Sequence, residues 1–117
     1  MQNYKDLKVW EKAHQFTLEV YRITEVFPKR EIYGLTNQLR RASVSIAANI
    51  AEGCGRKTKP DFAHFLNTSL GSSNESEYFL LPAKDLKYLR VEDYDILVKL
   101  INEIKAMLIS LIAKVRG

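Results

Sequence analysis

This sequence lacks the features of a secreted chain. Cys54 is its only cysteine, so no intrachain disulfide can form, which argues against a cross-linked extracellular scaffold. The residues that follow Met1, Gln-Asn-Tyr-Lys-Asp, lack the basic region and the apolar run of a signal peptide. We therefore expect a cytoplasmic protein.

No apolar run is long enough to cross a bilayer. The most apolar stretch, residues 96–113, is interrupted by Lys99, Asn102, Glu103 and Lys105. A charged residue at the centre of a bilayer costs roughly 3 kcal/mol, so we expect no membrane-spanning helix. The length of 117 residues is sufficient for one domain with a modest core, which we assign to residues 1–117.

Residue patterns that support catalysis or metal binding are also absent. His14 and His64 have no second histidine or cysteine pair at metal-ligand spacing. Cys54 has no general base near it in the sequence, so we interpret it as a bystander thiol. The segment 53–58 resembles a phosphate loop only superficially, because Arg56 occupies a required glycine position. We expect no catalytic residue, no metal and no cofactor.

What the sequence does contain is helical periodicity. Apolar residues recur at alternating intervals of three and four along the chain, the spacing of helices that bury one face. This spacing predicts helices at 7–27, from 33 or 34 to 52, at 59–88, and from about 91 to 116. The polar segment 71–77 is kept inside the third helix because the apolar phase continues beyond it. Short connections favour an all-α, antiparallel up-and-down four-helix bundle.

The predicted core consists of the residues that keep this spacing. On the first and fourth helices these are Val9, Ala13, Phe16, Val20, Ile23, Phe27, Leu97, Ile101, Ile104, Leu108, Leu111 and Val115. On the second and third helices they are Leu35, Leu39, Ala42, Ile46, Asn49, Gly53, Phe62, Leu66, Ser69, Ser73, Ser76, Leu80 and Ala83. Five further apolar residues lie outside this spacing, namely Trp10, Tyr21, Leu100, Met107 and Ile112. They add more apolar surface than one small bundle can cover. Their surplus predicts self-association.

Local signals define the ends of the helices. Asp6 is suited to cap the first helix. Gly53 and Gly55 favour a left-handed cap at the end of the second. Thr58, followed three residues later by Asp61, resembles a capping box that starts the third helix.

Only one part of the chain carries a net positive charge. Segments 1–28, 58–90 and 91–117 are each balanced, so residues 29–57 carry the whole net charge of +4. The cations of this segment are Lys29, Arg30, Arg40, Arg41, Arg56 and Lys57. Clustered cations attract polyanions such as nucleic acid, and the alternative is that they only solvate helix ends.

Polar side chains also lie among the small residues of the second and third helices. Asn49 and Glu52, together with Ser72, Glu75 and an arginine of the second helix, could form a buried polar network. A catalytic acid/base pair of Glu52 and Glu75 is the alternative. We favour a structural polar core of Asn49, Glu52, Ser72 and Glu75 that fixes the register of the helices.

The segment Arg40-Arg-Ala-Ser-Val-Ser-Ile-Ala-Ala-Asn-Ile-Ala-Glu-Gly-Cys-Gly-Arg56 resembles the signature of a known family. That four-helix-bundle family includes proteins encoded in intervening sequences of 23S ribosomal RNA genes. The likeness extends to the opening Tyr4–Ala13 and to the final apolar helix. Ala47 stands where members often have proline, and Ser76 where leucine is usual.

The resemblance implies a ring-like homopentamer. Accessory proteins of diversity-generating retroelements, which are related to the family, assemble in this way and bind nucleic acid and a reverse transcriptase. No catalytic residue is implied by the resemblance.

We therefore expect a non-enzymatic, oligomeric protein that binds nucleic acid, RNA in preference, through the six cations of residues 29–57. The start of the third helix, beside Arg56 and Lys57, is a candidate site for a backbone phosphate. The alternative is a protein-interaction scaffold that docks a partner on an exposed apolar helix face.

Overall fold

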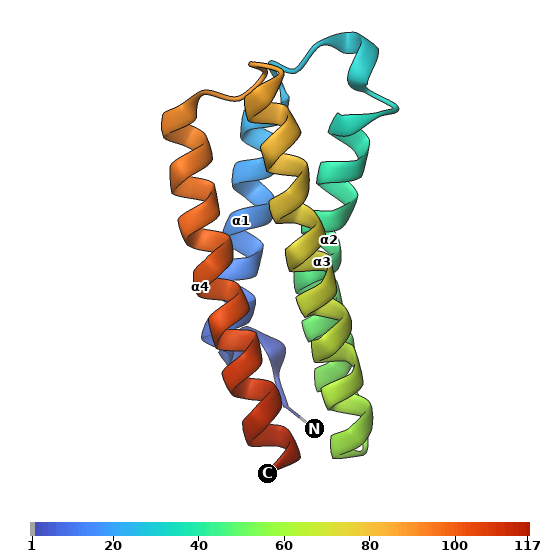
Figure 1. Cartoon of the computed structure of the whole chain (residues 1–117). Helices are drawn as coiled ribbons and strands as arrows, with labels where there is room; N and C mark the ends of the chain where they lie inside the picture. Colours follow the sequence, from blue (N-terminus) through green and yellow to red (C-terminus); the bar gives the residue numbers. More distant parts are fainter. Residues whose placement is uncertain (1) are drawn as a thin grey trace.

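The helical periodicity produces a four-helix bundle. The computed structural model describes residues 2–117, which contain no strand. Its α-helices are α1 (Lys8–Thr24), α2 (Leu35–Cys54), α3 (Lys59–Asp85) and α4 (Val91–Arg116), and two 3-10 helices, η1 (Tyr4–Asp6) and η2 (Lys29–Glu31), lie in the connections. Successive helices run in opposite directions, and each packs on its two neighbours in the ring α1-α2-α3-α4 (Figure 1). The predicted all-α up-and-down bundle is confirmed.

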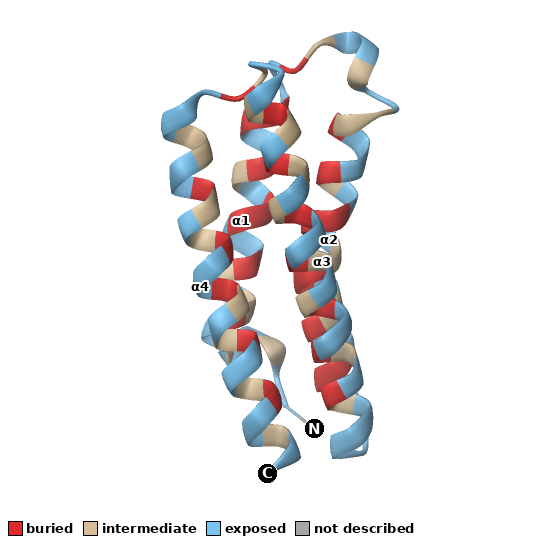
Figure 2. Cartoon of the chain, in the orientation of Figure 1, coloured by how far each residue is buried: buried red, intermediate tan, exposed pale blue. Residues whose placement is uncertain are grey.

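The core lies along one stripe of each helix (Figure 2). All six predicted core residues of the first helix are buried, and so are Leu97, Ile101, Ile104 and Leu108 of α4. Ile112 is only 7% exposed and belongs to the core, so counting it as surplus apolar surface was wrong. Within residues 2–117, no helix has the combination of length and apolarity that a bilayer crossing requires.

Small side chains bring α2 and α3 close together. Ser69 and Ser73 of α3 are fully buried, and the Ser69 hydroxyl donates a 2.8 Å hydrogen bond to the carbonyl of Ile46 in α2. Gly53 is buried at the other end of the same contact, against Phe62 and Phe65. The segment 71–77 is helical throughout, as its apolar phase predicts.

Two of the three predicted helix caps differ from the structure. Asp6 ends η1, and α1 begins after Leu7 without a side-chain cap, because the short helix η1 precedes it. Gly55 has a right-handed φ of −85°, so α2 ends without the predicted left-handed glycine. The third cap is confirmed, since Thr58 accepts a 3.2 Å hydrogen bond from the amide of Asp61.

A left-handed residue lies instead at the end of α3. Lys87 has φ 65°, and its amide donates to the Lys84 carbonyl at 2.9 Å. The next amide, of Tyr88, reaches back to the Ala83 carbonyl, also at 2.9 Å. These two bonds form a Schellman motif, which ends α3 three residues before the predicted Tyr88.

Candidate nucleic-acid interface

The six predicted cations do not meet in one patch. Lys29 and Arg30 lie in η2, before α2 begins, whereas Arg56 and Lys57 follow its last residue. The 20 residues of α2 separate these pairs by about 30 Å at a rise of 1.5 Å per residue. The structure therefore divides the cations between the two ends of α2, with Arg40 and Arg41 between them.

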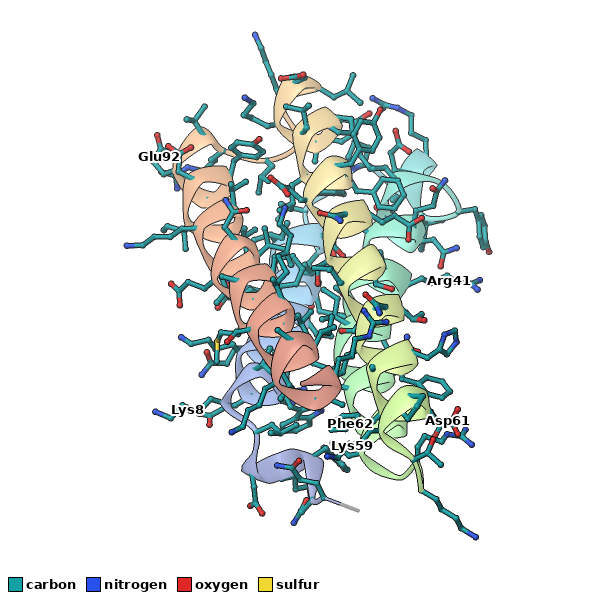
Figure 3. All side chains as sticks on the ribbon, turned by 60° about the horizontal axis from the view of Figure 1, so that its bottom comes forward. Lys8, Arg41, Lys59, Asp61, Phe62 and Glu92 are labelled. Atoms are coloured by element: carbon teal, nitrogen blue, oxygen red, sulfur yellow. The ribbon has the colours of Figure 1, made fainter. Side chains whose placement is uncertain are left out.

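Arg40 and Arg41 face different neighbours, because successive residues of a helix are about 100° apart. The Nε of Arg40 donates to Thr24 Oγ1 at 2.8 Å, and its guanidinium carbon lies 4.8 Å from the centre of the Tyr21 ring, both on α1. Arg41 is exposed and extends away from the bundle (Figure 3). Its base lines a hollow of about 360 Å³ shared with Glu75 of α3.

We call Lys29, Arg30 and Arg40 the junction cluster, because they surround the junction of α1 and α2. Lys29 and Arg40 line a common cavity there. Arg30 donates a 3.3 Å hydrogen bond to the hydroxyl of Tyr88, which itself donates to Glu31 at 3.1 Å. No carboxylate of the described residues forms an ion pair with these three cations. None of the three is therefore neutralised by a direct ion pair, although Glu25 lines the same cavity as Lys29 and Arg40.

We call Arg56, Lys57 and Lys59 the turn cluster, because they surround the turn between α2 and α3. All three line a cavity of about 190 Å³. Arg56 pairs with Glu52 at 2.8 Å, whereas Lys57 and Lys59 pair with no carboxylate of residues 2–117. Sequence reasoning missed Lys59, because the charge count assigned it to the balanced segment 58–90. Its position two residues after Lys57 was the signal that could have found it.

Only two of the four residues predicted to form the polar core, Asn49 and Ser72, lie at the contact between α2 and α3. The Asn49 side-chain amide donates to the carbonyl and the hydroxyl of Ser45, at 2.8 and 2.9 Å. The Ser45 hydroxyl is in turn 2.8 Å from that of Ser72, which links α2 to α3. Asn49 and Ser72 are both half-buried, at the edge of the α2–α3 contact.

Glu52 and Glu75 are exposed, so their predicted place in a buried network is wrong. The reason for Glu52 is that the next residue, Gly53, faces α3, which turns the glutamate outward toward Arg56. On α3 the buried positions nearest to Glu75 are Ser73 and Ser76, and Glu75 projects from the surface between them.

Cys54 is buried, and each of the two histidines contacts an aromatic ring. Burial raises the pKa of the Cys54 thiol, which keeps it protonated and unreactive at neutral pH. His14 stacks on Trp10 with ring centres 5.1 Å apart, and His64 meets the ring of Phe65 edge-on. Within residues 2–117, no group of three His, Cys, Asp or Glu side chains could hold a metal ion.

Comparison with known proteins identifies the family. The family model described as 23S rRNA-intervening sequence protein matches residues 5–110. The chain belongs to this family. A comparison with curated proteins finds no match.

A solved structure has a similar fold. It is a crystal structure from Bacteroides thetaiotaomicron, described as a protein of unknown function from the S23 ribosomal protein family. The two chains share 28% identity and superpose with a TM-score of 0.82 over 89% of this chain and 97% of the other.

Proposed function

We propose that this member of the intervening-sequence family is a non-enzymatic, oligomeric protein that binds structured RNA through the junction and turn clusters. The observation that supports this most is the grouping of cations without an ion pair along α2 and around its two ends. They are Lys29, Arg30, Arg40, Arg41, Lys57 and Lys59. Such cations attract phosphates over a long range and gain affinity by releasing counterions.

The separation of the clusters favours duplex segments as the ligand. The clusters lie about 30 Å apart along α2, so a ligand that contacts both must carry phosphates over that length, as an A-form RNA duplex does. A duplex lying along α2 would meet a backbone strand at each cluster. Arg41 would add a contact between them on the α3 side.

A homo-oligomer, which we propose to be the pentamer implied by the family resemblance, would repeat both clusters around a ring. Repetition strengthens binding of a long polyanion without any new kind of contact. Leu18 of α1 and Ile96 and Ile109 of α4 are 57%, 65% and 57% exposed, which supports self-association. Light scattering tests this, and a monomer at micromolar concentration would contradict it.

The RNA proposal is tested by the salt dependence of binding. Each phosphate contact contributes about 0.7–0.9 to the slope of log K against log salt concentration. The double variant Lys57→Gln/Lys59→Gln should therefore reduce the slope by about 1.4 to 1.8. The matched control is Lys8→Gln/Lys99→Gln, which removes two exposed, unpaired lysines from outside the clusters and should leave the slope unchanged. Absence of RNA binding at low salt, or a slope that both double variants change equally, would overturn the proposal.

A second candidate function is the docking of a protein partner. A groove of about 400 Å³ lies between the start of α1 and the end of α4, with Val9, Met107 and Leu111 in its lining. Met107→Lys would place a charge in this groove. Loss of a nuclease-resistant protein partner in that variant, with RNA binding unchanged, would favour the scaffold over the RNA-binding function.

A further inference from the structure

A cavity at the junction of α1 and α2 has the properties of an anion site. Its volume is about 130 Å³, whereas one water molecule occupies about 30 Å³, so it has room for more than one bridging water. Lys29 and Arg40 supply two cations to its lining, and Glu25 contributes one acidic group. The cavity is therefore small, with an excess of one positive charge in a lining completed by the apolar Phe27, Pro28 and Ile32.

Thr36 lines this cavity, and its hydroxyl is unsatisfied. The residue is only 5% exposed, and its Oγ1 is fully buried without a hydrogen-bond partner among the described residues. Burial of a hydroxyl without a partner is unfavourable, and native structures usually provide one. Rotation of the Thr36 side chain toward the cavity would let the hydroxyl donate to a ligand there.

The first turn of α2 adds backbone donors beside Thr36. The amide of Leu35 donates to Glu31 Oε1 and that of Gln38 to the Gly34 carbonyl, both at 3.0 Å. Of the two first-turn amides left over, that of Thr36 belongs to a residue of the cavity, whereas Asn37 lines the hollow on the α3 side. Free amides at the start of a helix, together with the helix dipole, favour an anion.

Arg40 is held in place before any ligand arrives. Its Nε is bonded to Thr24, and its guanidinium lies over the ring of Tyr21, which leaves the terminal nitrogens without a carboxylate. A guanidinium fixed in this way loses little freedom on binding and presents paired donors suited to phosphate oxygens.

We propose that this cavity binds one phosphate group of the RNA backbone, with Thr36, Arg40 and Lys29 as its donors. The inference rests on the proposed function. It assigns the junction cluster a defined phosphate site, whereas the proposed function requires only a general electrostatic attraction to RNA. Glu25 at the cavity opposes the bound charge and limits the affinity.

The first experiment titrates the full chain with inorganic phosphate and follows the backbone amide of Thr36 by nuclear magnetic resonance. This amide should shift in a saturable manner. Thr36→Val, which keeps the side-chain shape, and Arg40→Gln should each raise the Kd about fivefold or more. Arg41→Gln, which neutralises the neighbouring arginine outside the cavity, should leave the Kd within about twofold.

Glu25→Gln should strengthen phosphate binding, a result that a loss of folded structure would not produce. Removal of this acidic group should lower the Kd for phosphate about two- to fivefold, because it relieves a repulsion. Phosphate shifts that are absent in the native chain, or unaffected in all four variants, would overturn the site. A crystal grown with phosphate that shows only water against Thr36 would also overturn it.

The second experiment measures binding of a structured RNA to the same variants. Weaker binding by Thr36→Val and Arg40→Gln, with tighter binding by Glu25→Gln, supports the site. RNA binding that is equal in every variant overturns the site and leaves the proposed function standing. Phosphate binding without RNA binding overturns the proposed function and the assignment to RNA, and identifies a site for a free phosphate compound.

Discussion

Gly53 of α2 lies so close to Phe62 of α3 that a β-carbon on the glycine would come within 3.0 Å of the phenylalanine ring. The same β-carbon would lie 3.0 Å from Cβ of Phe65. Glycine is therefore required here by the packing of two helices, since α2 continues through this position with ordinary helical geometry.

Gly53→Ala should destabilise the fold by about 1–3 kcal/mol, because the overpacked contact outweighs the roughly 1 kcal/mol that alanine gains in helix propensity. Gly71→Ala is the matched control, since Gly71 lies inside α3 with open space where its β-carbon would be. This control should stabilise by about 0.5–1 kcal/mol. Urea denaturation measures both, and a stabilised Gly53→Ala variant would contradict the close contact.

Replacement by alanine should have different effects on stability at two fully buried serines of α3. Ser69 donates to the Ile46 carbonyl at 2.8 Å, whereas the Ser76 hydroxyl has no partner among the described residues. Ser69→Ala should cost about 1 kcal/mol for the lost bond. Ser76→Ala should be neutral or stabilise by up to about 1 kcal/mol, since it removes an unsatisfied hydroxyl. Equal losses of unfolding free energy in both variants would argue against this difference.

Lys87 holds the left-handed conformation at the end of α3 with a side chain that disfavours it. Lys87→Gly should raise the free energy of unfolding by about 0.5–1 kcal/mol, because glycine adopts this conformation without a steric penalty. Lys87→Ala removes the same charge but keeps a β-carbon, so it should give no comparable gain. Thermal denaturation distinguishes the two, and equal midpoints would indicate that the backbone conformation carries no cost.

Cys54 predicts a specific dependence of stability on pH. Burial raises its pKa in the folded state, so above its ordinary pKa of about 8.5 the unfolded chain releases a proton that the folded chain retains. The stability that Cys54 contributes is present below this pH and is lost as the pH rises further. The free-energy difference between the native chain and Cys54→Ala should therefore shrink between about pH 8 and 10. A difference that stays constant over this range would contradict the pKa shift.

The spacing of the apolar residues predicted the fold because it shows which residues are buried. A buried residue, however, does not always belong to a helix. Phe27 illustrates the difference: it is buried and packs on Tyr88 with ring centres 5.6 Å apart, yet α1 ends at Thr24. The apolar phase continues into the turn, so the predicted helix extended beyond the real one. Helix ends depend on local backbone bonds, such as those around Lys87, that apolar spacing does not record.

The candidate site was less predictable, because a count of charged residues does not show in which direction each side chain extends. Arg40 and Arg41 contribute equally to the net charge, but one is held against α1 and the other extends away from the bundle. The cavity beside Arg40 depends on Thr36, whose unsatisfied hydroxyl is a property of three-dimensional packing. Sequence spacing cannot distinguish it from a bonded threonine such as Thr24.

The serine-lined contact of α2 with α3 also defines where the bundle would open. Hydrogen bonds and a side-chain-free glycine hold these two helices together, whereas the α1–α4 side carries a groove of about 400 Å³. Sub-global opening would therefore separate α1 and α4 first, with α2 and α3 persisting as one cooperative hairpin. Their amides should be the slowest in the chain to exchange with deuterium.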